Sequence, residues 1–278
     1  MLKLHVCKRV DATFVYFTTL LLIAALFFLY NALTSGDIRQ KGKNSPVMGD
    51  LGGVSVEIPR DYARFVEYNK EPHFMEKEIG TKFGPTYQSK LRSLGFEVRY
   101  PDMASVKVQT KEEKDIFTTM WLRVGINTGE DYGVEGYLNR KKERYINSTL
   151  PCFSKCFIYH PLPSEIYGLT GYTPTGTGVD IEKRSVNFGR GTDIRDKNVY
   201  FVQNSTGHVT TFITCSNRVH AAARCTQYFN LSPQMKAHLR VNYRKGLLPH
   251  WQKIQQAVSN LIFNFEVKSK ESIGSVTL

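Results

Sequence analysis

The sequence predicts an α+β protein in which an N-terminal transmembrane helix precedes an antiparallel sheet domain that is covered by a C-terminal amphipathic helix. Three observations predict this class. Residues 12–33 carry no charge and are almost wholly apolar. Residues 199–243 contain short runs in which apolar and polar side chains alternate, separated by turn residues. After Pro249, apolar side chains recur at steps of three and four, which is the pattern of a helix with one apolar face.

The apolar segment 12–33 is long enough to cross a bilayer, which takes about 20 helical residues. Tyr16 and Tyr30 lie near its ends, where aromatic side chains meet the membrane surfaces. A cleaved signal peptide is the alternative, but its apolar region is normally shorter and ends in small residues, unlike the sequence around Tyr30. We therefore expect a cytoplasmic leader over residues 1–11 and a single-pass signal anchor over residues 12–33.

The orientation of this anchor depends on features outside it, because basic residues lie close to both of its ends. The short leader and the even number of cysteines in the rest of the chain favour a cytoplasmic N-terminus. The sequence then predicts an inner-membrane protein whose folded domain, residues 54–267, is periplasmic. Glycine, serine and proline mark residues 34–53 as a linker, and residues 268–278 form a polar tail.

Strands are predicted wherever apolar and polar side chains alternate over short runs. The turn sequence 204–207, Asn-Ser-Thr-Gly, separates two such runs and predicts a hairpin, so that residues 199–243 form an antiparallel meander. A helix of about 16 residues follows Pro249, and its apolar stripe, including Trp251, should pack on the sheet. The predicted strands are 54–58, 96–100, 119–126, 199–202, 209–214, 226–229 and 239–243.

The middle of the chain, residues 128–197, is rich in glycine, tyrosine and charged residues. The basic run 140–144 has the composition of a solvated loop or strand edge. Residues 167–178 combine glycine and proline with tyrosine and threonine. We interpret this region as long surface loops around short strands, and such loops carry function more often than the scaffold does.

Cys7 lies in the leader, whereas Cys152, Cys156, Cys215 and Cys225 form an even set in the folded domain. Four cysteines allow three pairings. We expect the local one, Cys152 with Cys156 and Cys215 with Cys225, in which the second bridge joins neighbouring antiparallel strands. Two alternatives remain open. Cys152 and Cys156 have the spacing of half a zinc site, although no second half follows, and all four could be free buried thiols.

The composition points to binding rather than catalysis. The net charge of +12 favours an anionic partner, although solubility alone also explains it. The G-x-S-x-G, H-E-x-x-H and P-loop motifs are absent, and no two histidines are four residues apart. The sequence therefore predicts no catalytic, cofactor-binding or metal-ligating residue. Nucleic-acid binding is not expected, because no binding motif accompanies the positive charge.

The stretch Val199–Val267 carries a resemblance to known proteins. It contains the hairpin, Cys215 and Cys225, the sequence from Tyr243 to Trp251, and the closing helix. This pattern resembles the bacterial inner-membrane-anchored immunity proteins that are associated with type VI secretion effectors, and its ending is similar to PsbP-like envelope domains. The first resemblance implies a binding protein that occludes a secreted toxin.

We expect the partner to bind on the two loop regions 132–144 and 167–178, since tyrosine and arginine are favoured at the centres of protein interfaces. An accessory protein of a secretion or cell-surface assembly is the alternative function, and a membrane-bound enzyme with a site assembled from loops is a third. The residues predicted to bind the partner are Tyr132, Tyr137, Arg140, Arg144, Tyr167 and Tyr172.

Overall fold

The computed structural model describes eight stretches of the chain: 45–69, 84–105, 119–129, 136–146, 155–180, 184–187, 196–218 and 223–267. The predicted leader 1–11, transmembrane segment 12–33 and tail 268–278 lie outside these residues, as does most of the predicted linker. The account below concerns the part of the chain from Pro46 onward.

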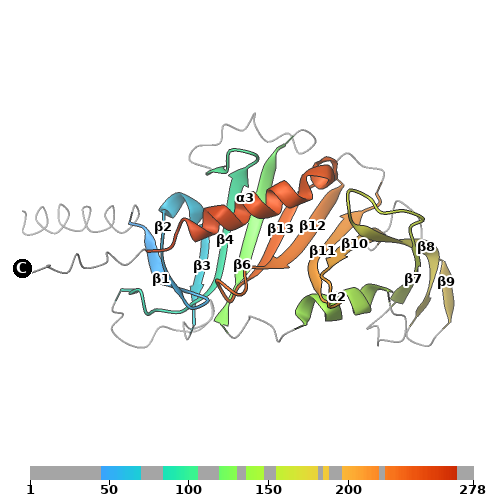
Figure 1. Cartoon of the computed structure of the whole chain (residues 1–278), viewed down its shortest axis with the longest axis horizontal. Helices are drawn as coiled ribbons and strands as arrows, with labels where there is room; N and C mark the ends of the chain where they lie inside the picture. Colours follow the sequence, from blue (N-terminus) through green and yellow to red (C-terminus); the bar gives the residue numbers. More distant parts are fainter. Residues whose placement is uncertain are drawn as a thin grey trace, which may run out of the picture. The chain divides into compact units, whose positions relative to one another are not determined.

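A sheet, rather than helices, dominates the described residues (Figure 1). The two α-helices among them are α2 (Tyr137–Ile146) and α3 (Trp251–Phe263). Neither is long and apolar enough to cross a membrane, which takes about 20 residues. This finding contradicts the predicted fold class, an α+β domain behind a transmembrane helix, and the predicted single-pass localisation in the inner membrane. Neither prediction is retained, and the described fold is a mainly antiparallel sheet.

The large sheet contains 11 strands, and every pair in it is antiparallel. Two short strands extend it, β5 (Ala104–Ser105) beside β4 and β9 (Ser185–Asn187) beside β8. The main path, in order of hydrogen bonding, is β3 (Phe65–Tyr68), β4 (Leu91–Arg99), β6 (Trp121–Asn127), β13 (His238–Arg244), β12 (Arg224–Asn230), β11 (Val209–Ser216), β10 (Lys197–Gln203), β8 (Thr170–Asp180) and β7 (Lys155–Pro161).

The predicted meander is confirmed, since β10 to β13 are consecutive in sequence and adjacent in the sheet. Residues 204–207 form the turn between β10 and β11. Gly207 takes a φ of 81°, and its amide donates to the carbonyl of Asn204. This left-handed conformation favours glycine, which explains why the turn sequence was informative.

Helix α3 covers one face of the sheet and runs across β4, β6, β13 and β12 (Figure 1). Its buried side chains are Trp251, Ile254, Val258 and Ile262, which confirms the predicted apolar stripe and the core position of Trp251. The 3-10 turn Lys245–His250 leads into it from β13.

A buried polar network also ties α3 to the sheet. The Tyr243 hydroxyl donates to Gln227 Oε1 at 3.0 Å, and Gln227 Nε2 donates to Gln255 Oε1 at 2.9 Å. Thr211 Oγ1 donates to the same Gln255 oxygen at 2.9 Å. The polar side chains of this network satisfy one another, so the network fixes where α3 sits along the sheet.

A separate hairpin of β1 (Val47–Leu51) and β2 (Val54–Ile58) packs into the same core. β1 lies inside the region predicted as a linker, so the folded domain begins earlier than residue 54. Gly52 at its turn has a φ of 64°, and a Cβ there would lie 2.6 Å from the Lys236 carbonyl oxygen. Glycine in this region suggested a linker, but Gly52 instead allows a tight turn that packs against the backbone of Lys236.

Helix α2 lies on the opposite face of the sheet, against β11 and β7. Alternation along β11 shows the two faces directly, because Ile213 points into the α3 core whereas Phe212 packs with Leu138 of α2. The loops predicted for this region are corrected, since residues 137–146 form a helix and residues 170–180 form the longest strand of the sheet.

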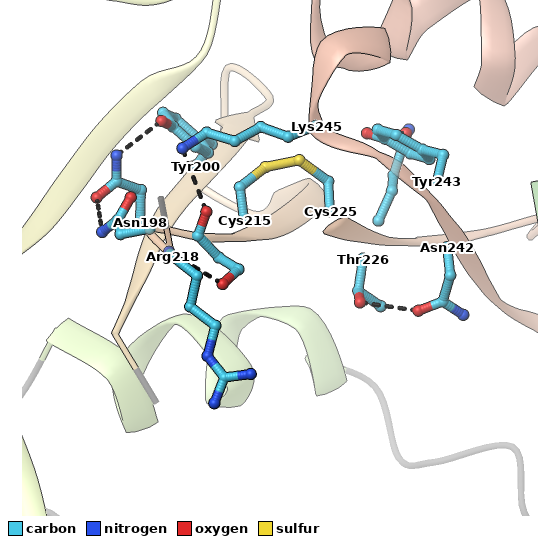
Figure 2. Close-up of a disulfide and its surroundings, with 12 residues drawn as sticks. Asn198, Tyr200, Cys215, Arg218, Cys225, Thr226, Asn242, Tyr243 and Lys245 are labelled. Atoms are coloured by element: carbon cyan, nitrogen blue, oxygen red, sulfur yellow. Dashed lines mark hydrogen bonds between the residues drawn. A yellow bond between two sulfur atoms is a disulfide. The ribbon is translucent and has the colours of Figure 1, made fainter. Parts of the chain in front are cut away.

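Cys215 and Cys225 form a disulfide between directly opposed residues of β11 and β12, as predicted. Their Cα atoms are 4.0 Å apart, and both residues are fully buried on the α3 side. Figure 2 shows the bridge on the same side of the strands as Tyr243, with Thr226 and Asn242 on the other side. The predicted pairing of Cys152 with Cys156 falls outside the described residues.

Candidate partner-binding surface

The second face of the sheet, the one that α2 partly covers, carries a set of cations that we call the basic face. It comprises Lys141, Lys197, Arg123, Arg224 and Arg240. Alternation in the strands produces it, because the residues between these arginines, such as Val124 and Val241, face the α3 core. Arg123, Arg224 and Arg240 are exposed.

Acidic side chains neutralise only one side of this surface. Glu97 on β4 accepts an ion pair from Arg123 at 2.9 Å and another from Arg64 at 2.7 Å. Because one carboxylate serves two guanidinium groups, this corner still carries a positive charge. The Arg123 side chain remains 66% exposed in this arrangement and can be reached by a partner.

The edge of α2 next to β12 and β13 holds the part of the surface that is most strongly organised. Lys141 Nζ lies 3.9 Å from the centre of the Tyr228 ring and 5.5 Å from that of Tyr137. It also donates to the Tyr137 hydroxyl at 3.5 Å. Arg240 stands opposite Tyr228 in the strand register. Aromatic rings therefore hold an ammonium group beside a guanidinium group, through the attraction of a cation to a ring face.

The electrostatic environment of this edge is unfavourable to its own cations. Burial, followed by the charges of Arg240, Arg144 and Lys197, lowers the pKa of Lys141 to about 8. Burial and the charge of Arg240 also lower the pKa of Lys197. No acidic group within the described residues contributes to either shift. Like charges therefore lie close to one another here, and no described acidic group acts on them.

A stacked pair of rings supports the site from the side. The rings of Tyr137 and His238 have centroids 4.6 Å apart, and His238 Nδ1 is 2.5 Å from Asn230 Oδ1. Tyr137 is therefore held by β13 as well as by its own helix. This support fixes the ring on which the Lys141 ammonium rests.

Beyond Arg240, towards the β3 edge, the sheet presents two glycines in a row. Phe65 is paired with Gly95, Gly95 with Gly125, and Gly125 with Arg240. The Phe65 side chain is 71% exposed. The Phe65 side chain lies over Gly95, where a Cβ would be 3.4 Å from Phe65 Cδ2, whereas Gly125 leaves the backbone open, so that a partner can approach the strands at Gly125.

The predicted partner-binding residues are divided between the two faces. Tyr137, Arg140 and Arg144 lie on α2 of the second face, and Arg140 and Arg144 are exposed. Tyr172 of β8 is half-buried and stacks on Phe201, with 5.9 Å between the ring centroids. It therefore belongs to the packing beneath α2.

Tyr167 lies apart from these residues. It is 55% exposed at the turn before β8, where it takes a φ of 56°, and its carbonyl accepts a hydrogen bond from Trp251 Nε1 at 3.0 Å. That contact places it beside α3, on the other face. Tyr132 lies outside the described residues.

Sequence analysis missed Lys141, Lys197, Arg123, Arg224 and Arg240 as a group, because they come from five different elements. A signal was present in β13, where arginines alternate with Val241 and Tyr243. This alternation marks one strand with a polar, cationic outer side. It does not indicate which other strands lie beside it.

Among the described residues, no group of three or more histidine, cysteine, aspartate or glutamate side chains is placed to hold a metal ion. The absence of catalytic, cofactor-binding and metal-ligating residues stays a prediction for the chain as a whole. The geometry at the basic face suits recognition of negative charge and of apolar groups.

Comparison with known proteins gives similarity of fold alone. No protein family matches the chain, and no curated protein matches it in sequence. The solved structure of Smlt3025, an immunity protein of the Stenotrophomonas maltophilia type IV secretion system, is similar over 81% of this chain and 94% of its own, with 15% identity and a TM-score of 0.53. The iron-regulated outer membrane lipoprotein FrpD of Neisseria meningitidis covers the same shares at 11% identity, but its TM-score of 0.35 carries no argument.

Smlt3025 is described as an immunity protein, and at 15% identity the likeness to it is one of fold. Its secretion system is of type IV, so it does not support the predicted association with type VI secretion. The described part of this chain shares its fold with a secretion-system immunity protein.

Proposed function

We propose that this protein is an immunity-type inhibitor that binds a protein toxin through the basic face. Two observations support the proposal. The fold is similar to that of an immunity protein, and the second face of the sheet presents exposed arginines and an exposed phenylalanine where the first face is covered by α3. The observation that carries most weight is the exposed arginine set, because arginine and aromatic side chains dominate the energetics of protein interfaces.

The partner should be acidic where it meets this face. Matching charges steer two proteins together and suppress contacts with other partners, and they do so most strongly at low salt. Gly125, opposite Arg240, leaves room for a partner loop to lie on the strands. A toxin covered in this way would lose access to its own active site.

The test is co-expression with the protein encoded beside this one in the source genome. Cells that produce that protein should stop growing, and co-expression of this chain should restore growth. The Arg240→Glu variant should lower protection and weaken binding of the purified pair by about 100-fold, as expected for a central interface arginine. Binding is measured by calorimetry with the two purified proteins.

The matched control is Lys253→Glu, which makes the same change of charge on the exposed side of α3. It should leave binding within about threefold of the wild type, the range expected for a charge outside the interface. Equal protection by both variants would contradict the basic face as the binding site. Constitutive association with other envelope subunits, with no growth protection, would favour the assembly alternative.

A further inference from the structure

Two cations meet at the Tyr228 ring on the edge of α2 described above, and the charge of a third acts on both of them. Lys141 comes from the helix, Lys197 from β10 and Arg240 from β13. The charges of Lys197 and Arg240 act on Lys141, and the charge of Arg240 acts on Lys197. We call these three residues the cationic cluster.

None of the three forms an ion pair within the described residues. The nearest carboxylate on α2, that of Glu143, lies 4.0 Å from Lys142, and Glu97 is already shared by two arginines. Lys142 itself turns to the other side of the helix, with Nζ 5.0 Å from the centre of the Phe201 ring. The cluster therefore has a positive charge that no described side chain of the protein balances.

The cluster is also held in place before any ligand arrives. The rings of Tyr228 and Tyr137 fix the Lys141 ammonium, and the stack of Tyr137 on His238 fixes that ring in turn. Arg240 is exposed, so a ligand can reach the cluster from solvent. Gathering like charges in a partly buried position is costly, and a bound anion would remove that cost while gaining charge-assisted hydrogen bonds.

We propose that Lys141 and Arg240, which meet at the Tyr228 ring, form an anion-binding site that receives the carboxylate of an aspartate or glutamate side chain of the protein partner, and that Lys197 adds to its positive charge. The partner rests on the proposed function, whereas the anion site can be tested without it. A carboxylate accepts hydrogen bonds from two or three cationic donors at once, and Arg240 offers the planar group that pairs with it in two contacts. Phosphate shares this chemistry, and the experiment separates the two.

The first experiment titrates the purified full chain with citrate, a soluble tricarboxylate, and separately with inorganic phosphate. Sodium chloride keeps the ionic strength constant, and NMR follows the Lys141 ammonium and its pKa. Citrate should raise the pKa of Lys141 from about 8, because a bound anion favours the charged lysine. The affinity for citrate should fall at least fivefold in both Lys197→Gln and Arg240→Gln, and it should stay unchanged in Lys253→Gln.

Two results would overturn the anion site as proposed. An unchanged affinity for citrate in both cluster variants would place the bound anion elsewhere, and a response to phosphate without one to citrate would exclude a carboxylate ligand. Two cluster variants are used so that misfolding of one leaves the test standing, and the amide spectrum of each variant reports its fold.

The second experiment separates this inference from the proposed function. If the neighbouring gene product is bound and the cells are protected, Lys197→Gln should weaken that binding at least tenfold. Suppose that the cluster variants lose affinity for citrate but that the wild-type protein binds no toxin. This result would support the anion site and contradict the proposed function. Strong toxin binding that Lys197→Gln and Arg240→Gln leave unchanged would contradict the role of the cluster in recognition and leave the function standing.

Discussion

The sequence predicts the wrong surroundings for Lys141, although this residue belongs to the candidate binding surface. It lies in a basic run whose composition indicated a solvated loop. In the structure its ammonium rests on the Tyr228 ring, and Tyr137, four residues earlier on the same helix, lies on its other side. The sequence shows that Tyr137 and Lys141 are one helical turn apart. It does not show that Tyr228, from a strand nearly 90 residues away, lies beside them.

We expect Lys141→Met to stabilise the protein at pH 7 by about 1 kcal/mol, because the ammonium is partly buried among other cations and methionine keeps the contact with the rings. Between pH 8 and pH 10.5 the unfolded chain holds the Lys141 proton that the folded protein has released. As the pH rises through this window, the free energy of unfolding of the wild type should therefore increase relative to that of the variant.

Urea denaturation at pH 7 and pH 10 measures both effects. A difference between wild type and Lys141→Met that does not change with pH would show that the pKa of Lys141 is not lowered.

Helices and strands with a strong local sequence pattern are predicted correctly, whereas those with a weak pattern are not. The meander and α3 were predicted because alternation, a turn glycine and a three-four stripe each lie within a few residues. Strand β8 was read as loop because Pro174, Gly176 and Gly178 interrupt it. These three residues are buried in a strand that pairs with β7 and β10, so tertiary packing overrides a weak local preference.

The disulfide between β11 and β12 should contribute to stability mainly by restricting the unfolded chain. It closes a loop over a sequence separation of 10, for which the loss of chain entropy corresponds to about 2–3 kcal/mol. We expect the double variant Cys215→Ala/Cys225→Ala to lose about that much free energy of unfolding, measured by urea denaturation.

Reduction of the wild type offers an independent check of the same bridge. Both cysteines are fully buried, so dithiothreitol should reduce them only as fast as the protein opens. Rapid reduction of the native protein, or equal denaturation midpoints for wild type and double variant, would contradict a structural role for the bridge.

The molecule as a whole has an extensive core on one face of the sheet and a small one on the other. The α3 side unites β1, β2, β4, β6 and the meander with the helix. Among the described residues, five buried hydrophobic side chains form the cluster on the α2 side, those of Leu138, Val199, Phe201, Val209 and Phe212. Stability is therefore unevenly distributed, and α2 should open more readily than α3.

Native-state hydrogen exchange tests this inequality. The amides of α2 should exchange through an opening of lower free energy than those of β12, β13 and α3. Leu138→Ala removes about 2–3 kcal/mol of packing and should speed exchange in α2 by 30- to 100-fold while leaving α3 protected. Ile254→Ala, a deletion of similar size in the α3 core, should speed exchange in the central strands. A uniform response to both variants would show that the two layers unfold as one.

The arrangement of strands was the part of the fold that lay beyond sequence analysis. Consecutive strands of the meander are neighbours, and this local rule was sufficient to place them. The pairing of β6 with β13 joins residues that 110 positions separate, and no local pattern specifies it. The basic face depends on that pairing, since it brings Arg123 beside the arginines of β13. For this reason the sequence predicts which kinds of residue form the site but not which particular residues come together in it.

The position of β13 has a consequence for biosynthesis. It is the fourth of the nine strands on the main path of the sheet and the last of the described strands to leave the ribosome, so β6 lacks its second hydrogen-bonding neighbour until β13 has been made. During that interval β6 offers an open strand edge beside apolar side chains, a surface on which nascent chains associate with one another. Translation of this protein therefore includes a long vulnerable period, and chaperones that shield such edges should matter most for its yield.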